Sequence, residues 1–485
     1  MPLTFQNTYA RLPDQFFSHQ PAADIPAPVM LKMNRALADR LGIGAATLDN
    51  ADGAAFLSGA AFPEGAEPVA MAYAGHQFGN FVPQLGDGRA LLLGEVLAPD
   101  GMRFDIHLKG SGRTQFSRGG DGKAVLGPVL REYLIGEAMA ALGVPTTRAL
   151  AAVLTGETVW REEPEPGAVL ARVAASHIRV GTFQFFYVRQ DFEALRRLLD
   201  YAIERHYPQA ASADVPALAF LGAVMARQAA LVARWMGVGF IHGVMNTDNM
   251  AISGETIDYG PCAFMDTYDP GTVYSSIDQM GRYAYANQPR IAHWNLAQLA
   301  QSLLPLVPGE PEAAANALQG VVDGFPALYD GEWLAVFGRK IGLVAPTPGD
   351  QAMIEDLLAL MADAKADFTL AFRHLTRALA TDKWQDIEAT FAAAPVFADW
   401  RHRWLARLGA DRALAVKAMV AANPAFIPRN HRVEAALQAA RNCDMSIFEE
   451  LLAILSRPYA EQPENAAFEA PPGPGEAVQA TFCGT

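Results

Sequence analysis

Apolar and polar positions follow two different periods along the chain, and the change falls near residue 185. Before it, residues 91–96 and 103–108 form the short runs typical of strands, with a helical pattern over residues 129–143. Beyond it, apolar residues recur at helical spacing, as they do over residues 216–236. The pattern predicts an α+β region followed by a larger, mainly helical region.

The same pattern divides the chain into four parts. We expect an N-terminal extension over residues 1–70, an α+β lobe over 71–185, a mainly helical lobe over 186–458 and an extended or poorly ordered tail over 459–485. Residues 29–43 have helical spacing, and residues 181–190 form a plausible crossing segment between the lobes. The helices expected in the second lobe cover residues 191–207, 216–236, 295–304, 311–323, 333–337, 350–364, 366–379, 386–392, 397–408, 412–421 and 432–456.

The stretch over residues 239–260 carries the densest set of polar side chains between short apolar runs. Its turn chemistry predicts a β-hairpin that brings Asn249 and Asp258 to one point. An amide oxygen and a carboxylate suit a hard divalent cation such as Mg²⁺, and Asp248 adds a second carboxylate. The alternative is that these Asp and Asn residues only form turns.

Glycines and one lysine flank two neighbouring strands in the first lobe. Gly86 and Gly88 precede the strand at 91–96, and Lys109 ends its partner, so backbone amides and an ammonium group could meet phosphates there. Glu132, on the following helix, could pair with Lys109. The alternatives are ordinary turn glycines and a solvent-facing glutamate.

Charge and composition narrow the classes of partner. A net charge of −14 and a pI of about 5.2 argue against nucleic acid as the main partner, although a local basic pocket remains compatible with them. Arg172, within an apolar strand, and Arg179 are either paired structurally or directed at an anion. Without a secretory pattern or an 18-residue apolar run, and with three cysteines, we expect a cytoplasmic protein with no membrane partner.

The order of these parts resembles a protein-kinase-like fold. The segment from His242 to Asn249 is similar to the catalytic loop of kinases, and Asp258-Tyr259-Gly260 is similar to their metal-binding motif. Val244 stands where a kinase has its catalytic aspartate. Because valine cannot accept a proton, ordinary transfer of a γ-phosphoryl group would lack its usual base.

Five motifs resemble the selenoprotein O (SelO) family of protein adenylyltransferases: AGHQFGNFVPQLGDGRA, HLKGSGRTQFSRGGDGKA, REYLIGEAM, HGVMNTDNM and IDYGPCAFMD. The resemblance covers nearly the whole chain. It implies an α+β, protein-kinase-like, two-lobed fold with an N-terminal extension and an enlarged helical C-terminal region. It also implies transfer of AMP, from ATP bound in a flipped direction, to Ser, Thr or Tyr hydroxyls of protein substrates, with release of pyrophosphate.

The resemblance assigns a role to each candidate site residue. Asp248 would be the proton acceptor, with a pKa that need not be raised much, because a base must be ionised. Asn249 and Asp258 would hold Mg²⁺, with Mn²⁺ as an alternative, and Glu132 would orient Lys109. The residues expected to bind ATP are Gly86, Gly88, Arg89, Lys109, Asp121, Gly122, Arg172 and Arg179.

The resemblance also suggests a role for two of the cysteines. The family carries a Cys or selenocysteine third from its end, which is Cys483 here, and Cys262 lies just after the Asp-Tyr-Gly motif. We hypothesise that the two form a disulfide that ties the tail across the site under oxidising conditions. The alternative is two unrelated free thiols.

Two other functions stay open at this point. The chain could be an ATP-binding pseudokinase without catalysis, or a small-molecule phosphotransferase that uses Asp248 as a displaced base. Retention of both metal ligands and of three cations favours the adenylyltransferase, which we expect to act as a monomer.

Overall fold

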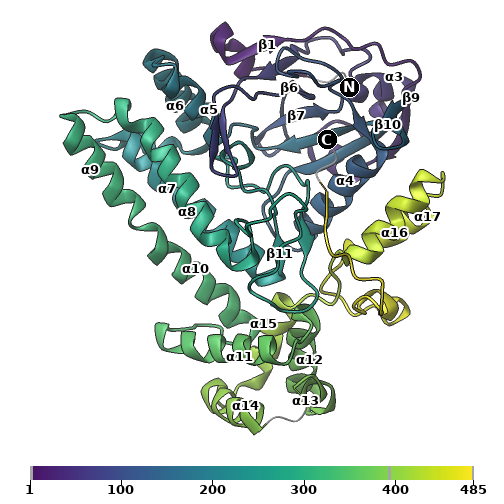
Figure 1. The fold of residues 1–485 in the computed structure, drawn as a ribbon, viewed down its shortest axis with the longest axis vertical. Coiled ribbons are helices and arrows are strands. Elements are labelled where there is room, and N and C mark those ends of the chain that lie inside the picture. The colour runs from purple at the N-terminus through teal and green to yellow at the C-terminus, as the bar shows by residue number, and fades with distance from the viewer. Residues whose placement is uncertain (1–3, 392–394, 483–485) are drawn as a thin grey trace.

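The computed structural model describes residues 4–391 and 395–482. It places an antiparallel sheet beside a long array of helices (Figure 1). The strands are β1 (Phe17–His19), β2 (Val29–Met33), β3 (Val69–Met71), β4 (Gly75–Gln77), β5 (Asn80–Val82), β6 (Ala90–Leu97), β7 (Arg103–Lys109), β8 (Ala124–Val125), β9 (Arg148–Trp160), β10 (Pro164–Ala174), β11 (Phe240–Ile241) and β12 (Ala263–Phe264).

The helices fall into an N-terminal group, a helix beside the sheet and a long C-terminal series. They are α1 (Arg35–Arg40), α2 (Ala45–Leu48), α3 (Ala51–Ser58), α4 (Leu126–Ala141), α5 (Val180–Val188), α6 (Phe192–His206), α7 (Pro216–Val238), α8 (Gln288–Leu303), α9 (Pro311–Val322), α10 (Phe325–Lys340), α11 (Gln351–Asp363), α12 (Phe368–Thr381), α13 (Gln385–Thr390), α14 (Pro395–Leu408), α15 (Arg412–Ala422), α16 (Asn430–Arg441) and α17 (Ser446–Leu455).

The main sheet of the described chain is covered on both faces. Its strand order is β1-β3-β6-β7-β10-β9-β2, with β8 paired to β10 and every pairing antiparallel. Side chains of α1 to α3 pack on one face, and α4 packs on the other. This double cover explains why β6 and β10 read as nearly continuous apolar runs, since neither strand has a face directed at water.

Helices α16 and α17 pack on α4, although they lie about 300 residues further along the chain (Figure 1). Arg131 of α4 and Glu434 of α16 form an ion pair of 2.8 Å between Nη1 and Oε1. The sheet is therefore backed by α4, and α4 is held in turn by the C-terminal end of the chain.

Helix α7 forms the centre of the helical part. Its apolar side chains, including Leu221, Val224 and Val232, are buried against neighbouring helices. By length and composition α7 could cross a membrane, but 56% of its most apolar window is buried inside the molecule, as expected of a core helix.

The hairpin expected over residues 250–257 does not form. The turn is present, with Gly254 at φ +79° and its amide bonded to the Ala251 carbonyl. The flanking residues pair elsewhere, Ala251 with Arg179 and Thr256 with Thr146. Because a hairpin of two such short strands is at best marginally stable by itself, the two flanks bond instead to the segments over residues 145–147 and 178–180.

Three other elements differ from the sequence expectation. Residues 29–43 form β2 followed by α1, because edge pairing with β9 captures the apolar start of the segment. The crossing segment over residues 181–190 is largely the helix α5. The helix expected over 432–456 is two helices, divided where Cys443 takes a left-handed φ of +64°.

The tail is extended in part, but its described residues are anchored. Residues Pro463–Phe468 form a 3-10 turn, and Arg377 binds Glu469 at 3.0 Å. Near its end Thr481 forms a parallel bridge with Ser275. These polar contacts thus anchor the tail together with Tyr459 and Phe468, which pack against the hydrophobic core.

Gly181 fixes how closely α5 approaches the segment before β4. Its carbonyl accepts a 2.9 Å bond from the Ala74 amide, and an added Cβ would lie 2.0 Å from the Ala74 oxygen. We expect Gly181→Ala to destabilise the fold by about 1–3 kcal/mol through this backbone clash. Differential scanning calorimetry should show a lower midpoint of unfolding.

Gly222→Ala is the matched control, because Gly222 also lies in a helix and its added Cβ would approach no closer than 3.9 Å to Val321. Its midpoint should be unchanged or slightly higher, since alanine has the better helix propensity. Equal midpoints for the two variants would contradict the packing argument.

Candidate functional site

A cleft with a volume of about 760 Å³ lies where the sheet meets the loop over residues 244–261. Its walls come from the start of β6, the end of β7, the loop before β8, β10 and the start of α5. The predicted residues that line it are Gly86, Gly88, Arg89, Lys109, Asp121, Gly122, Arg172, Arg179, Asp248, Asn249 and Asp258.

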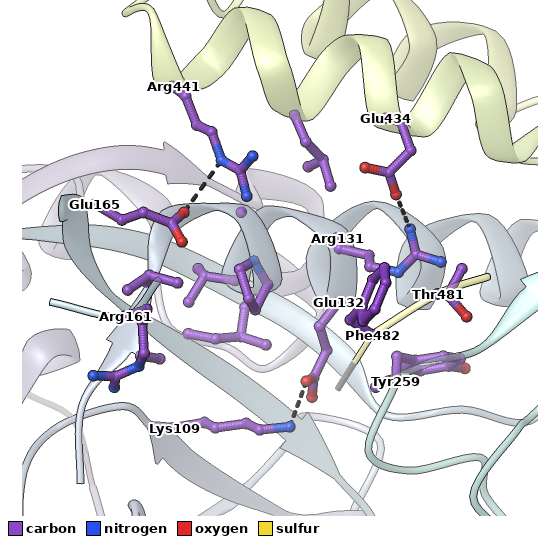
Figure 2. A pocket seen from close by; sticks show the side chains of 18 of the residues that line it. Lys109, Arg131, Glu132, Arg161, Glu165, Tyr259, Glu434, Arg441, Thr481 and Phe482 are labelled. Atoms are coloured by element: carbon purple, nitrogen blue, oxygen red, sulfur yellow. Dashed lines mark hydrogen bonds and ion pairs between the residues drawn. The ribbon is translucent and has the colours of Figure 1, made fainter. Parts of the chain in front are cut away.

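Glu132 is the one predicted residue that stands behind this cleft. Its Oε2 accepts a 2.6 Å bond from the Lys109 ammonium, so the expected contact between the two is present. Figure 2 shows this pair at the base of a neighbouring cavity of about 580 Å³, whose rim carries the Arg131–Glu434 and Arg441–Glu165 pairs. Glu132 therefore belongs to the charge cluster but not to the wall of the larger cleft.

Three cations converge on the Asp258 carboxylate. Its Oδ1 lies 2.6 Å from Arg172 Nη1 and 3.2 Å from Lys109 Nζ, and its Oδ2 binds Arg179 Nη1. Arg172 Nη1 also binds Glu132 Oε1 at 3.0 Å. Burial alone would raise the pKa of Asp258, but the charges of Arg172, Arg179 and Lys109 hold it well below its usual range. Asp258 therefore stays ionised.

Local structure fixes where each of these charges stands. The register of β7 and β10 pairs His107 with Arg172, which places Lys109 and Arg172 on the same face of the sheet. Arg179 is the N-cap of α5, and its guanidinium lies 4.7 Å from the centre of the Tyr73 ring. Asp258 takes a left-handed φ of +60°, a conformation that aspartate tolerates better than most residues.

Asp248 is buried at the floor of the cleft. It lies in the single 3-10 turn Thr247–Asn249, and its Oδ2 accepts a 3.4 Å bond from Gln77. Within the described residues its Oδ1 has no hydrogen-bond partner. Burial raises the pKa of Asp248 to about 6, more than the small shift expected from the sequence. The group is still largely ionised at neutral pH.

Glycine is required beside this carboxylate. A Cβ added to Gly75 would lie 2.3 Å from Asp248 Oδ1, so no larger residue fits without displacing the acid. Gly75 and Gln77 both belong to β4, and together they define the space around the carboxylate. Sequence reasoning assigned neither residue a role, although both lie in the motif AGHQFGNFVPQLGDGRA, because a motif does not show which distant side chain its residues contact.

The donors around Asn249 and Asp258 fit a hard cation. The Asn249 amide nitrogen donates to the Val244 carbonyl at 3.0 Å, which leaves the amide oxygen as the atom that can ligate a metal. Among the residues that the structure describes, no group of three His, Cys, Asp or Glu could hold an ion. A metal here would complete its shell with water or substrate oxygens, as Mg²⁺ does at phosphate sites.

Cys262 lies beside the cluster, but its environment does not favour the reactive thiolate. It is fully buried, and burial raises the pKa of its thiol to about 11. Its carbonyl accepts a 2.5 Å bond from Arg131, and the neighbouring Pro261 carbonyl accepts a 2.6 Å bond from Thr481 Oγ1. The described part of the tail thus reaches the segment of Cys262, whereas Cys483 lies outside the described residues, so the proposed disulfide stays a prediction.

Comparisons with known proteins agree over nearly the whole length. A family model described as protein adenylyltransferase SelO matches residues 1–456. The chain is 58% identical to a protein nucleotidyltransferase YdiU of Bradyrhizobium diazoefficiens over 485 residues, with 99% of each chain covered. It is 57% identical to the YdiU protein of Rhodopseudomonas palustris, again over 99% of each chain, and 56% identical to that of Rhizobium etli, over 99% and 97%.

The molecule is therefore a nucleotidyltransferase, of the class that modifies proteins. The chain belongs to the SelO family of protein adenylyltransferases. This membership implies a nucleotide substrate, a protein substrate and, as is usual for such enzymes, a divalent metal.

The raised pKa of Asp248 makes a prediction about stability. A pKa that is higher in the folded than in the unfolded chain means that stability is lost as pH rises from about 4 through 6. The asparagine of Asp248→Asn cannot ionise. The free energy of unfolding of the variant, relative to that of the wild type, should therefore increase by about 1–2 kcal/mol between pH 5 and pH 8. Urea unfolding with a chelator present measures this difference.

Asp363→Asn, at an exposed position of α11, is the control and should differ from the wild type by the same amount at both pH values. An advantage of Asp248→Asn that does not change with pH would contradict the proposed burial of the charge.

Proposed function

We propose that this enzyme transfers AMP from ATP to Ser, Thr or Tyr hydroxyls of proteins and releases pyrophosphate. The observation that carries the proposal is that the cleft lacks an acid at the position of the kinase base but has one at a nearby position. Val244 occupies the position of a kinase base, while Asp248 offers a buried carboxylate whose pKa lies near 6. A base with such a pKa is ionised at neutral pH and strong enough to accept a hydroxyl proton.

We propose a protein-kinase-like arrangement with residues 71–185 and 186–458 as its two lobes. The order of elements supports it: the strand β7 ending in Lys109, the helix α4 carrying Glu132, two further strands, and then a helical region that begins with α5. Residues 1–70 would be an extension that contributes β1, β2 and α1 to α3, and residues 459–485 a tail, whose described part reaches the cleft at Phe482.

The cations of the cleft would hold the triphosphate. Lys109, Arg172 and Arg179 supply three positive charges, and Gly86 and Gly88 let backbone approach the phosphates closely. The same cations now neutralise Asp258, so phosphate oxygens would share or replace that partner. Residues Arg89, Asp121 and Gly122 line the remaining wall, with Asp121 bound to Arg161 at 2.8 Å.

The reaction would be an in-line displacement at the α-phosphorus. Asp248 accepts the proton of the acceptor hydroxyl, whose oxygen forms a bond to the α-phosphorus. The bond from that phosphorus to the bridging oxygen breaks, and pyrophosphate leaves with the electron pair. Mg²⁺, held by Asn249 and Asp258, would neutralise negative charge on the phosphates.

We further propose that the enzyme works as a cytoplasmic monomer, with no nucleic-acid or membrane partner. The net charge of −14 supports the absence of a nucleic-acid partner. The protein substrate would have to offer an exposed hydroxyl, because the carboxylate of Asp248 stands at the floor of the cleft.

ATP labelled separately at its α- and γ-phosphates tests the direction of transfer. We expect label on protein from the α-position only, and loss of at least 100-fold in Asp258→Ala, because the metal and the three cations lose their common carboxylate. Transfer from the γ-position would instead indicate a phosphotransferase, and transfer from neither a pseudokinase.

Asp444→Ala is the control for that substitution, because Asp444 is exposed and lies far along the chain between α16 and α17. Its transfer rate should equal that of the wild type. Transfer of the α-label that survives in Asp258→Ala would contradict the assigned site.

The pH dependence of kcat/KM for ATP reports on the base. We expect it to rise between pH 5 and 7 with an apparent pKa near 6 and then to level off, since Asp248 must be ionised. Asp248→Asn should lose about 100- to 10,000-fold in rate, and with it this rise. An unchanged profile in the variant would assign the base elsewhere.

A further inference from the structure

His107 lies behind the charge cluster, between two residues that contact it from opposite sides. Its Nε2 is 3.0 Å from Asp87 Oδ2, and its Nδ1 is 3.2 Å from Arg172 Nε. All three side chains are at least 98% buried. The sheet itself sets this contact, because the register of β7 and β10 places His107 directly beside Arg172.

The direction of the two hydrogen bonds fixes the tautomer of the ring. An arginine Nε–H can only donate, so Nδ1 of His107 must be the unprotonated acceptor. The ring proton then lies on Nε2 and is donated to Asp87. Asp87 is held in its turn by the Met71 amide, which donates to the same Oδ2 at 3.0 Å. His107 is thus a neutral ring with one defined orientation.

This arrangement constrains the arginine that faces the cleft. With Nε held from behind, Nη1 of Arg172 points forward to Glu132 at 3.0 Å and to Asp258 at 2.6 Å. A guanidinium is planar, so fixing Nε also fixes the plane in which both Nη atoms lie. Among the described residues, His107 makes the hydrogen bond to Nε of Arg172, and the other two hydrogen bonds of the guanidinium are made by Nη1.

A second ring supports the first. His177 stacks on His107 with ring centres 4.2 Å apart and planes inclined by 16°. Its own Nδ1 lies 3.0 Å from Asp105 Oδ2, and Arg205 binds the other oxygen of Asp105 at 2.5 Å. The imidazole that contacts Arg172 is therefore held by a hydrogen bond at its edge and by a fixed ring at its face.

We propose that His107, oriented by Asp87, is a positioning residue that sets the guanidinium of Arg172 for the triphosphate and for Asp258. The proposal rests on the function proposed above, since Arg172 matters to the chemistry only as a nucleotide-binding cation. His107 is not among the residues that line the cleft, so it would act through Arg172.

Two substitutions of the same shape separate hydrogen bonding from packing. His107→Asn keeps an oxygen that can accept from Arg172 Nε, whereas His107→Leu has the same branched outline without an acceptor. We expect kcat for AMP transfer to fall at least 10-fold in the Leu variant and less than 3-fold in the Asn variant, with a smaller change in KM for ATP. Equal losses in the two variants would overturn the proposal.

A double substitution tests whether the effect passes through Arg172. In an Arg172→Lys background there is no Nε–H in the corresponding place, so His107→Leu should cause less than a 2-fold further loss. An undiminished 10-fold loss there would mean that His107 acts by another route. Asp444→Ala, at the exposed position between α16 and α17, is the control, and it should leave kcat within 2-fold of the wild type.

A measurement without catalysis keeps this inference separate from the proposed function. ¹⁵N NMR of histidine-labelled protein should show His107 protonated at Nε2 and unprotonated at Nδ1, and Arg172→Lys should shift its Nδ1 resonance. A ring protonated at Nδ1 overturns the inference even if AMP transfer is found. Absence of transfer in the wild type, with this tautomer present, overturns the proposed function instead.

Discussion

The buried ion cluster around Asp258 is the constraint on which the rest of this molecule depends. A carboxylate removed from water is costly by several kcal/mol unless opposite charges and hydrogen bonds compensate it. Here the compensation comes from Lys109, Arg172 and Arg179, each on a different element. The buried carboxylate is therefore compensated only when three parts of the molecule are in place together: the sheet, α5 and the loop over residues 239–260.

The architecture meets this requirement by backing each charged residue with a rigid neighbour. Lys109 ends a central strand, Glu132 lies on a helix enclosed between the sheet and α16, and Arg179 caps α5. Asp248 has no ion pair with these cations, and burial, the largest cause, raises its pKa despite the opposing charge of Arg179. Lys109, Arg172 and Arg179, which pair with Asp258, and the separate carboxylate of Asp248 thus line the same cleft.

Much of this could be predicted from the sequence, because local patterns carry it. Strand β7 and its closing Lys109, the helix with Glu132 and the long helix α7 follow from apolar period and from proline and glycine positions. The membership of the SelO family followed from motifs alone. The paired segments around Gly254 did not, since short strands choose partners by tertiary contact, and no local pattern shows that Ala251 pairs with Arg179.

Burial of polar residues was the least predictable property. The expected pKa of Asp248 was nearly normal because its isolation depends on Gly75 and Gln77, more than 170 residues away. His107 and Asp87 lie in two of the quoted motifs, but no role was predicted for either, because only the sheet register shows that His107 lies beside Arg172. The roles of such residues are defined by neighbours from other elements, which a motif does not reveal.

The packing of α16 on α4 has a consequence for biosynthesis. Arg131 and Glu434 are 303 residues apart in sequence, so α4 emerges from the ribosome long before its outer cover is made. At roughly 5–20 residues per second, α4 waits about 15–60 s with an apolar face exposed. The sheet-containing part would spend that interval as a client for chaperones, and the alignment of Glu132 with Lys109 would be completed only when synthesis is almost finished.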